Sequence, residues 1–431
     1  MRHATKNLAL VARLLGLAGL CGLVTVSSAY AATINVPANQ PTIGQAISAA
    51  VPGDTINVAA GTYTEQLVIS KNLTLIGAGT GSTIVQAPAV LTVDATLPPG
   101  SGGQATAVIK IDSAAVVSMS GFAIEGPGST ACGSIGYGIF VGGGASLTFN
   151  NDRISDIRDN PAGGCQNGVG IRAGAQSTGQ VGTLSMSNSS VVNFQKAGIV
   201  VDNIGSSATL SGNTVTGLGP VGIASNGIQI SRGANATVTN NTITSAQCDI
   251  APPVCGADPT ANAQSAGILL YDSGSVTATG NTVSGNDTGV QVFNDTTSGV
   301  GTLTLNNNTL SNNLYENVFV ESATLNLSTT NKVIGSNYGV YVGSFSGDVS
   351  NAVVNLVGCN QVSGATVANT QTVTGGGATT TPTINGTTSA VACSGPAVAL
   401  VPAPASAPWM LILQALTLLA MAGIVLPRRD C

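Results

Sequence analysis

A phrase that opens on glycine and then alternates apolar and polar residues recurs along most of this 431-residue chain. Successive phrases start between 22 and 40 residues apart, and the longer steps contain loop insertions. The reference positions are Gly138, Gly170, Gly198, Gly227, Gly267, Gly289, Asn317 and Gly339. A repeat of this length requires an architecture in which each unit packs on its neighbours.

Each repeat has the periodicity of short strands with one buried face. The residues one and three places after the reference position are apolar, as at Ile228 and Ile230, and the residue between them varies. A second alternating stretch, such as Leu303 and Leu305, precedes a polar position. That position holds Asp152, Ser189, Asn213, Asn241, Asn281, Asn308, Asn331 and Asn360. Short strands joined by Gly and Asn turns predict the coils of a parallel β-solenoid, with a ladder of asparagine amides between coils.

The N-terminal part of the chain adds a resemblance to this pattern. A helix is expected over Thr42 to Ala50, and one apolar face of it can close the end of the stack. The motifs PGDTI and GTYTE follow within Thr33 to Gly126. Together they resemble the opening of the pectin-lyase-like superfamily. The resemblance implies an all-β fold, a single-stranded right-handed parallel β-helix of about eleven coils with a short N-terminal capping helix.

Both ends differ in composition from the repeats. Residues 1–31 carry basic residues ahead of an apolar run and then small residues, which predicts a secretory signal peptide. The β-helix domain is expected over residues 32–400. Residues 409–426 form an apolar run that could cross a bilayer, followed by Arg428 and Arg429.

The last part of the chain, residues 401–431, resembles a C-terminal sorting signal of Gram-negative surface proteins. Pro404 and Trp409 match the spacing of the IPTL type, and Val401 to Pro404 is similar to the PEP type with Ala in place of Glu. The resemblance implies that export machinery and a sortase-like protease are partners, and that the helix lies in the membrane before processing. The alternative is a permanent anchor. Either way we expect the protein in the cell envelope, on the outer surface or outside the cell.

Charge and composition exclude several classes of protein. Between the two ends the chain has eight basic and 17 acidic residues, and no His or Trp. A nucleic-acid partner is therefore not expected, because a basic surface is missing. With 43% hydrophobic residues and a net charge of -5, the chain is not of the disordered class.

Six cysteines remain between the ends, and an even number in an exported chain predicts disulfides. Their places in the repeat favour the pairs Cys132 with Cys165, Cys248 with Cys255, and Cys359 with Cys393. A zinc site is not expected, since His and CxxC motifs are missing there. No cofactor is indicated, although acidic side chains could hold calcium.

One acidic and basic cluster is a candidate catalytic site. Its members are Asp152, Asp156, Arg158, Asp159 and, one coil on, Arg172. Such groups could bind or cleave an anionic sugar. The alternative is a surface loop whose opposite charges pair with one another.

A second candidate surface comes from the outward positions of the first strand in each repeat. Stacked coils would place these side chains in two columns, and the resemblance implies that this face carries saccharide. The candidate carbohydrate-binding residues are Phe140, Arg172, Asp202, Gln229, Tyr271, Gln291, Phe293, Glu321 and Tyr341. Aromatic rings could stack on sugars while amides and carboxylates bond hydroxyl groups. Ordinary aromatic pairing between strands is the alternative.

Two functions remain open at this point. The first is a non-catalytic surface protein that binds a polysaccharide or the cell-surface matrix, or contributes to adhesion or envelope structure. The second is a polysaccharide lyase or glycoside hydrolase that acts on an acidic polysaccharide.

Overall fold

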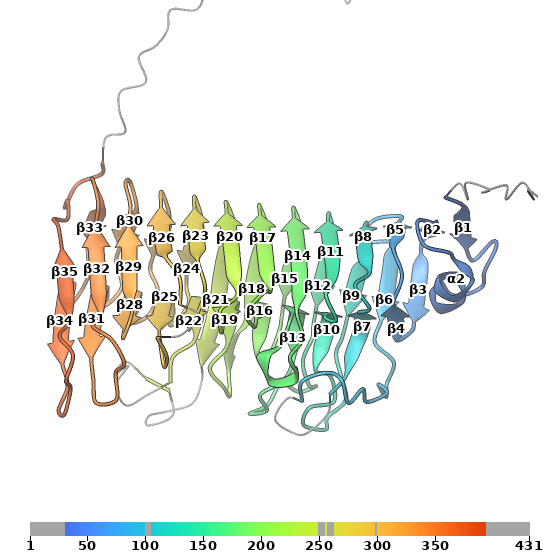
Figure 1. The fold of residues 1–431 in the computed structure, drawn as a ribbon, viewed down its shortest axis with the longest axis horizontal. Coiled ribbons are helices and arrows are strands. Elements are labelled where there is room, and N and C mark those ends of the chain that lie inside the picture. The colour runs from blue at the N-terminus through green and yellow to red at the C-terminus, as the bar shows by residue number, and fades with distance from the viewer. Residues whose placement is uncertain (1–30, 100–104, 249–254, 257–262, 298–299, 394–431) are drawn as a thin grey trace, which may run out of the picture.

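The computed structural model describes residues 31–99, 105–248, 255–256, 263–297 and 300–393. The described chain forms an elongated stack of coils that runs from β1 at one end to β34 and β35 at the other (Figure 1). The coils build three long sheets, which we name sheets A, B and C, and every strand pairing between coils is parallel. The predicted all-β solenoid is confirmed.

Sheet A contains β1 (Thr33–Val36), β2 (Thr55–Val58), β5 (Leu73–Gly77), β8 (Val116–Ser120), β11 (Ala145–Asn150), β14 (Gly182–Ser187), β17 (Ser207–Ser211), β20 (Asn235–Thr239), β23 (Val276–Thr279), β26 (Leu303–Asn306), β29 (Thr324–Leu327), β32 (Val353–Leu356) and β35 (Thr383–Asn385). Sheet B contains β3 (Gly61–Thr64), β6 (Thr83–Gln86), β9 (Ala123–Glu125), β12 (Arg153–Ser155), β15 (Ser190–Val192), β18 (Thr214–Val221), β21 (Thr242–Cys248), β24 (Thr282–Ser284), β27 (Thr309–Ser311), β30 (Lys332–Ile334) and β33 (Gln361–Ser363). Sheet C contains β4 (Leu67–Ile69), β7 (Ala107–Ile111), β10 (Tyr137–Val141), β13 (Val169–Ala173), β16 (Ala197–Asp202), β19 (Asn226–Ser231), β22 (Ala266–Tyr271), β25 (Thr288–Phe293), β28 (Glu316–Glu321), β31 (Tyr338–Ser344) and β34 (Ala368–Thr374).

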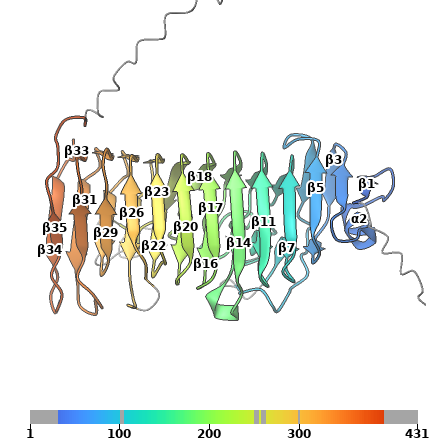
Figure 2. The same cartoon turned by 45° about the horizontal axis from the view of Figure 1, so that its top comes forward.

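The helix α2 (Ile43–Ala49) lies at the β1 end of the stack (Figure 2). Thr42 caps it, because its side chain accepts a hydrogen bond from the Gln45 amide. The Glu65 carboxylate accepts hydrogen bonds from the first two helical amides, those of Ile43 at 2.9 Å and Gly44 at 2.8 Å. The helix buries Ile43, Ala46 and Ile47 against the first coil, as the apolar face predicts.

The core lies inside the coils and follows the register that the repeat predicts. Ile228 pairs with Ile199 and Ile268 in the neighbouring coils and is fully buried, whereas the adjacent Gln229 is half-exposed. The reference glycines mark a close approach of successive coils. A Cβ on Gly227 would lie 2.6 Å from the carbonyl oxygen of Gly267 and 2.4 Å from the Ile243 side chain. That approach explains why glycine recurs at this position.

The polar position of each repeat forms the predicted ladder. From Asn213 to Asn360, each asparagine donates its side-chain amide to the side-chain oxygen of the next, at distances from 2.9 to 3.1 Å. Their backbone amides from Asn213 to Asn308 donate to the same oxygens. Asp152 and Ser189 occupy the same column before it. The ladder satisfies polar groups that would otherwise be buried without partners.

Three disulfides link the six cysteines in the pairs that the repeat favours. Their Cα separations are 5.7 Å for Cys132–Cys165, 6.1 Å for Cys248–Cys255 and 5.8 Å for Cys359–Cys393. All three fall in the range that a disulfide can bridge. The predicted pairing is confirmed.

Among the described residues, no helix is long and apolar enough to cross a membrane. The predicted signal peptide up to residue 30, the helix over 409–426 and the sorting residues Pro404, Trp409, Arg428 and Arg429 lie outside the described residues. Those expectations stay predictions.

Candidate functional site

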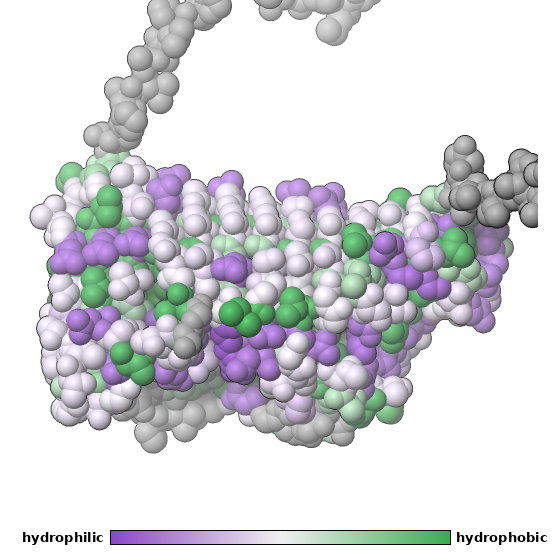
Figure 3. Space-filling model, in the orientation of Figure 1, coloured by the Kyte–Doolittle hydropathy of each residue, from purple (hydrophilic) through white to green (hydrophobic). Residues whose placement is uncertain are grey.

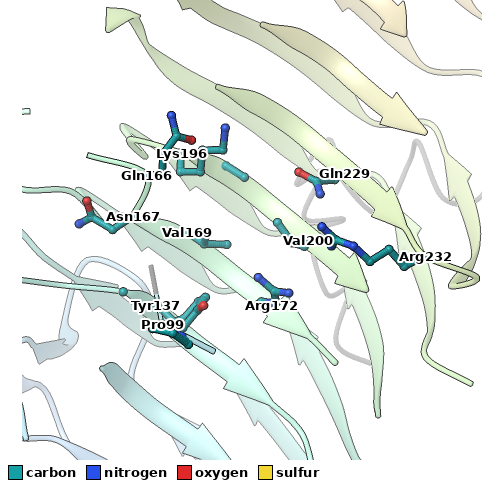
Figure 4. Close-up of a pocket in the computed structure, with 12 residues that line it drawn as sticks. Pro99, Tyr137, Gln166, Asn167, Val169, Arg172, Lys196, Val200, Gln229 and Arg232 are labelled. Atoms are coloured by element: carbon teal, nitrogen blue, oxygen red, sulfur yellow. The ribbon is translucent and has the colours of Figure 1, made fainter. Parts of the chain in front are cut away.

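A cavity of about 160 Å³ lies on the outer side of sheet C, over β10, β13, β16 and β19 (Figure 4). Three basic residues line it: Arg172 on β13, Lys196 just before β16, and Arg232 just after β19. The described residues that line the cavity include no acid. Three of the eight basic residues between the two ends of the chain therefore converge on one small space.

Asp202, at the end of β16, holds two of these cations in place. Its carboxylate is fully buried and lies 2.6 Å from Nη2 of Arg172 and 2.9 Å from Nη1 of Arg232. It also accepts hydrogen bonds from the backbone amide of Gln176, which begins the short turn η1 (Gln176–Thr178), and from the Ser231 hydroxyl. Burial alone would raise the pKa of Asp202, but the two guanidinium groups hold it below its usual value. One carboxylate thus orients two arginines and leaves an excess positive charge.

Lys196 is the third cation, and no acid forms an ion pair with it in the described part of the chain. Its Nζ donates a hydrogen bond to the carbonyl oxygen of Ala224 at 2.8 Å. Burial lowers the pKa of Lys196 to about 8. An anionic ligand in the cavity would supply the counter-charge that this lysine lacks.

Polar and aromatic side chains surround the three cations. The ring of Tyr137 lies under the Arg172 guanidinium, 5.9 Å from its centroid, and the Tyr137 hydroxyl donates to the Pro98 carbonyl oxygen at 2.8 Å. Gln229 also lines the cavity, and its amide contacts the Ser231 hydroxyl at 3.3 Å. The cavity therefore offers donors for hydroxyl groups beside its positive charge.

A second, wider groove of about 620 Å³ adjoins this cavity and shares Arg232 with it. Tyr271 lines the groove and stacks on Phe293 of the next coil, with ring centroids 5.8 Å apart and planes inclined by 16°. The Arg232 guanidinium lies 5.4 Å from the centre of the Tyr271 ring. A hydrogen bond from the Tyr271 hydroxyl to Asp295, at 2.5 Å, raises the pKa of Tyr271 to about 12. Tyr271 stays uncharged and is packed between Phe293 and the Arg232 guanidinium, and it lines the groove, where a sugar can contact it.

The predicted carbohydrate-binding residues differ in where they lie and in how exposed they are. Arg172, Gln229 and Tyr271 line the cavity or the groove. Phe293 stacks on Tyr271, and Gln291 is half-exposed on the same strand. These five lie on neighbouring strands of sheet C, from β13 to β25.

The expectation that all these side chains face outward to solvent is wrong for three of them. Phe140 is 1% exposed because a second apolar cluster, which includes Leu97, covers the outside of β10. Tyr341 is 6% exposed and packs against Phe319 and Tyr338. Asp202 is buried by its two arginines. Phe140 and Tyr341 therefore have little surface to offer a sugar.

Glu321 lies farther along the stack, on β28, and is half-buried. Burial and, after it, the nearby carboxylates of Asp348 and Asp295 together raise the pKa of Glu321 to about 8. It does not line either cavity.

The acidic and basic cluster predicted around Asp152 is not brought together as one site. Asp152 belongs to the ladder column, and its Oδ1 accepts from the Phe122 amide at 2.7 Å. Asp159 is also buried and accepts from the amides of Gly133 and Ser134. Asp156 and Arg158 pair with each other at 3.4 Å, and Arg172 lies in the cavity with Asp202 instead. Asp152, just before β12, and Asp159, after it, are buried and accept hydrogen bonds from backbone amides, whereas Asp156 is half-buried and pairs with Arg158.

Lys196 and Arg232 are functional candidates that reasoning from the sequence missed. A signal for them exists, since Arg172, Lys196 and Arg232 all lie within five residues of a reference glycine in three successive repeats. In a chain with so few basic residues, that clustering indicates one face of the coil. No group of three or more His, Cys, Asp or Glu side chains placed to hold a metal ion occurs in the described ranges.

A known family has the same architecture. The model of the family described as "Right handed beta helix region" matches residues 170–355. The chain is a right-handed parallel β-helix. No curated protein matches it.

Several solved structures resemble the chain at low identity. The pectin methylesterase from Aspergillus niger is 16% identical, with a TM-score of 0.40, over 65% of this chain and 85% of that one. An alginate lyase from Paenibacillus sp. is 14% identical, with a TM-score of 0.38, over 83% and 99%. The A-module of the mannuronan C-5 epimerase AlgE4 from Azotobacter vinelandii is 14% identical, with a TM-score of 0.39, over 82% and 94%.

Proposed function

We propose that the protein is an exported β-helix that binds an acidic polysaccharide along sheet C. The observation that carries the proposal is the convergence of Arg172, Lys196 and Arg232 on one cavity whose described lining contains no acid. A carboxylate or sulfate group of the polysaccharide would occupy this cavity. The neighbouring residue of the sugar chain would contact Tyr271 in the adjoining groove.

Export and surface location belong to the same proposal. Three disulfides support an oxidising compartment, because such bonds persist outside the cytosol. The N-terminal signal sequence and the C-terminal sorting signal would deliver the protein to the cell envelope, the outer surface or the medium. There the site would attach the protein to a matrix or surface polysaccharide.

A binding assay with a matched variant tests the site. Lys196→Gln removes one charge from the cavity, and Lys332→Gln removes one from an exposed position on sheet B. We expect oligomers of galacturonate, mannuronate or guluronate to bind the wild type and Lys332→Gln alike, and Lys196→Gln at least about tenfold more weakly. Equal weakening by both variants would mean unspecific charge attraction, and neutral oligosaccharides that bind equally well would contradict the proposal.

One observation favours a second candidate, cleavage of the bound chain by β-elimination. Burial lowers the pKa of Lys196 to about 8, so about one tenth of it is neutral at pH 7 and can accept a proton. Arg172, in the same cavity, would hold the uronate carboxylate and acidify the proton on the adjacent carbon. As Lys196 takes this proton, its electron pair would form the C=C double bond, the bond to the glycosidic oxygen would break, and that oxygen would take a proton from water. Hydrolysis is less well supported, since it requires two carboxyl groups across the scissile bond and the described cavity lining has none. Unsaturated uronate ends released by the wild type and not by Lys196→Gln would establish the lyase.

A further inference from the structure

The outer face of sheet A carries two regular columns of hydroxyl and amide side chains. The central column has thirteen members, all Thr, Ser or Asn: Thr33, Thr55, Thr74, Ser118, Thr148, Ser185, Thr209, Thr237, Thr277, Thr304, Asn326, Asn355 and Asn385. The flanking column lies two residues farther along each strand: Asn35, Asn57, Ile76, Ser120, Asn150, Ser187, Ser211, Thr239, Thr279 and Asn306. Ile76 is their single apolar member, and neither column contains a charged or aromatic residue.

The hydroxyl groups in the middle of the central column are open to solvent. Thr148, Thr209, Thr237 and Thr277 are exposed, and none of the four hydroxyls forms a hydrogen bond with another described residue. Figure 3 shows this side of the molecule as even rows of intermediate hydropathy over β14 to β26, with few of the strongly polar residues that lie along the lower edge. The face therefore presents free hydroxyl groups and methyl groups at regular intervals.

The strand register fixes the spacing of these groups. Parallel strands lie about 4.8 Å apart, and residues two places apart on a strand are about 6.6 Å apart. The two columns thus form a nearly rectangular net, which is rigid because every coil is hydrogen-bonded to the next. A rigid net of this kind matches a partner that is itself periodic over many repeats, better than a flexible chain.

The chemistry of the face decides between periodic partners. Binding of an acidic glycan would require cationic side chains, and binding of a neutral glycan by ring stacking would require aromatic side chains. The two columns contain neither kind of residue. A second copy of the chain would need a large apolar area to compensate for burying the hydroxyls, and Ile76 is the only large apolar side chain in the two columns. The remaining periodic partner is crystalline water, whose oxygen atoms also form a regular lattice. Threonine suits it, because the methyl group orders water and the hydroxyl group hydrogen-bonds to it.

We propose that the two columns on sheet A form an ice-binding surface. Each hydroxyl makes only a weak contact, but contacts that are fixed in register form together, so their free energies add without a further loss of rotational freedom. The proposed polysaccharide site lies on sheet C, so the two surfaces are independent. An adsorbed β-helix would prevent the crystal front from advancing where it is bound.

Partition into slowly growing ice tests this proposal with the full-length protein. Tyr at positions 237 and 277 keeps strand propensity but breaks the net, so the double variant Thr237→Tyr/Thr277→Tyr should stay in the liquid, while the wild type enters the ice. The matched control is Thr242→Tyr/Thr282→Tyr, which places the same rings on exposed positions of sheet B and should enter like the wild type. Equal melting temperatures of the three proteins show that the fold is kept.

Several results would overturn the proposal. Exclusion of the wild type from ice would do so, as would entry of the sheet A variant at the wild-type level. If the sheet B control lost its entry into ice to the same extent, the ice-binding surface could not be assigned to sheet A. Retention of the wild type, but not of the sheet A variant, on microcrystalline chitin or cellulose without entry into ice would identify a crystalline glycan as the partner instead.

Discussion

Asp152 lies in the ladder column but has no side-chain amide to donate, and its replacement by asparagine should stabilise the protein. Oδ1 of Asp152 accepts a hydrogen bond from the Phe122 amide, but Oδ2 is buried with no hydrogen-bond partner among the described residues. From Asn213 onward an asparagine amide fills this place, and that of Asn213 donates at 3.0 Å to the carbonyl oxygen of Met186. By the register, Asp152→Asn would direct its amide to the carbonyl oxygen of Met119.

The pKa of Asp152 sets the size of the effect. Burial raises it from 3.8 to about 7, so the folded state resists ionisation while the unfolded state ionises freely. Below about pH 4 the aspartate is protonated in both states and carries no penalty. Between about pH 4 and 7 the wild type loses stability as the pH rises, and above about pH 8 the loss is constant. A shift of roughly three pKa units corresponds to up to about 4 kcal/mol.

Urea unfolding of the wild type and Asp152→Asn across this pH range measures the difference. We expect a small difference at about pH 4 and a gain for the variant that grows to its full size by about pH 8. Asn241→Asp is the matched control in the same column. It should be less stable than the wild type at about pH 8, because it buries a carboxylate where the ladder needs a donor. If Asp152→Asn is no more stable than the wild type at that pH while the control loses stability, Asp152 does not bear the ionisation penalty.

Three other outcomes follow from the core, the coil contacts and the cavity. Ile228→Asp should unfold the protein or lower its free energy of unfolding by several kcal/mol, whereas Gln229→Asp should lower it by under about 1 kcal/mol. Similar melting curves for the two variants would show that the register is wrong. Gly227→Ala should lower the free energy of unfolding, measured by thermal unfolding, by about 1–3 kcal/mol, because the added Cβ would contact the next coil. Gly81→Ala, which has open space around it, should leave the stability unchanged. An equal effect of the two variants would contradict the close approach of the coils at Gly227. The affinity for an acidic oligosaccharide should fall as the pH rises through about 8 and Lys196 loses its charge, and calorimetry should find this dependence missing in Lys196→Gln.

The fold was predictable from the sequence because one periodic rule determines most of it. The alternation around Ile228 sets the buried face, the column that includes Asn241 sets the corner, and the glycine column sets the distance between coils. Each is a local pattern that repeats with the coil. The disulfides followed because Cys132 and Cys165 occupy equivalent places in adjacent coils.

The candidate site was only partly predictable, because loops that do not follow the repeat create it. Phe140 occupies an outward position, but the segment around Leu97 covers it. This segment does not follow the repeat, so the periodic pattern does not predict that it buries Phe140. Arg172 and Arg232 come together through the buried Asp202, a contact across coils, while Lys196 lines the same cavity from the start of β16. Asp152 was predicted both as a ladder residue and as a catalytic acid, and the first interpretation is confirmed by its hydrogen bonds.

The asparagine ladder also bears on how such a chain can change its length. The coils from Asn213 to Asn360 present the same side-chain amide and parallel strand edges to their neighbours, so one of these coils is nearly interchangeable with another at its two contact faces. Gain or loss of one whole repeat would therefore close the gap with the same bonds, whereas a change of a few residues within a strand would break them. Genetic duplication of single repeats could lengthen or shorten the molecule in steps of one coil, and the three sheets would grow together.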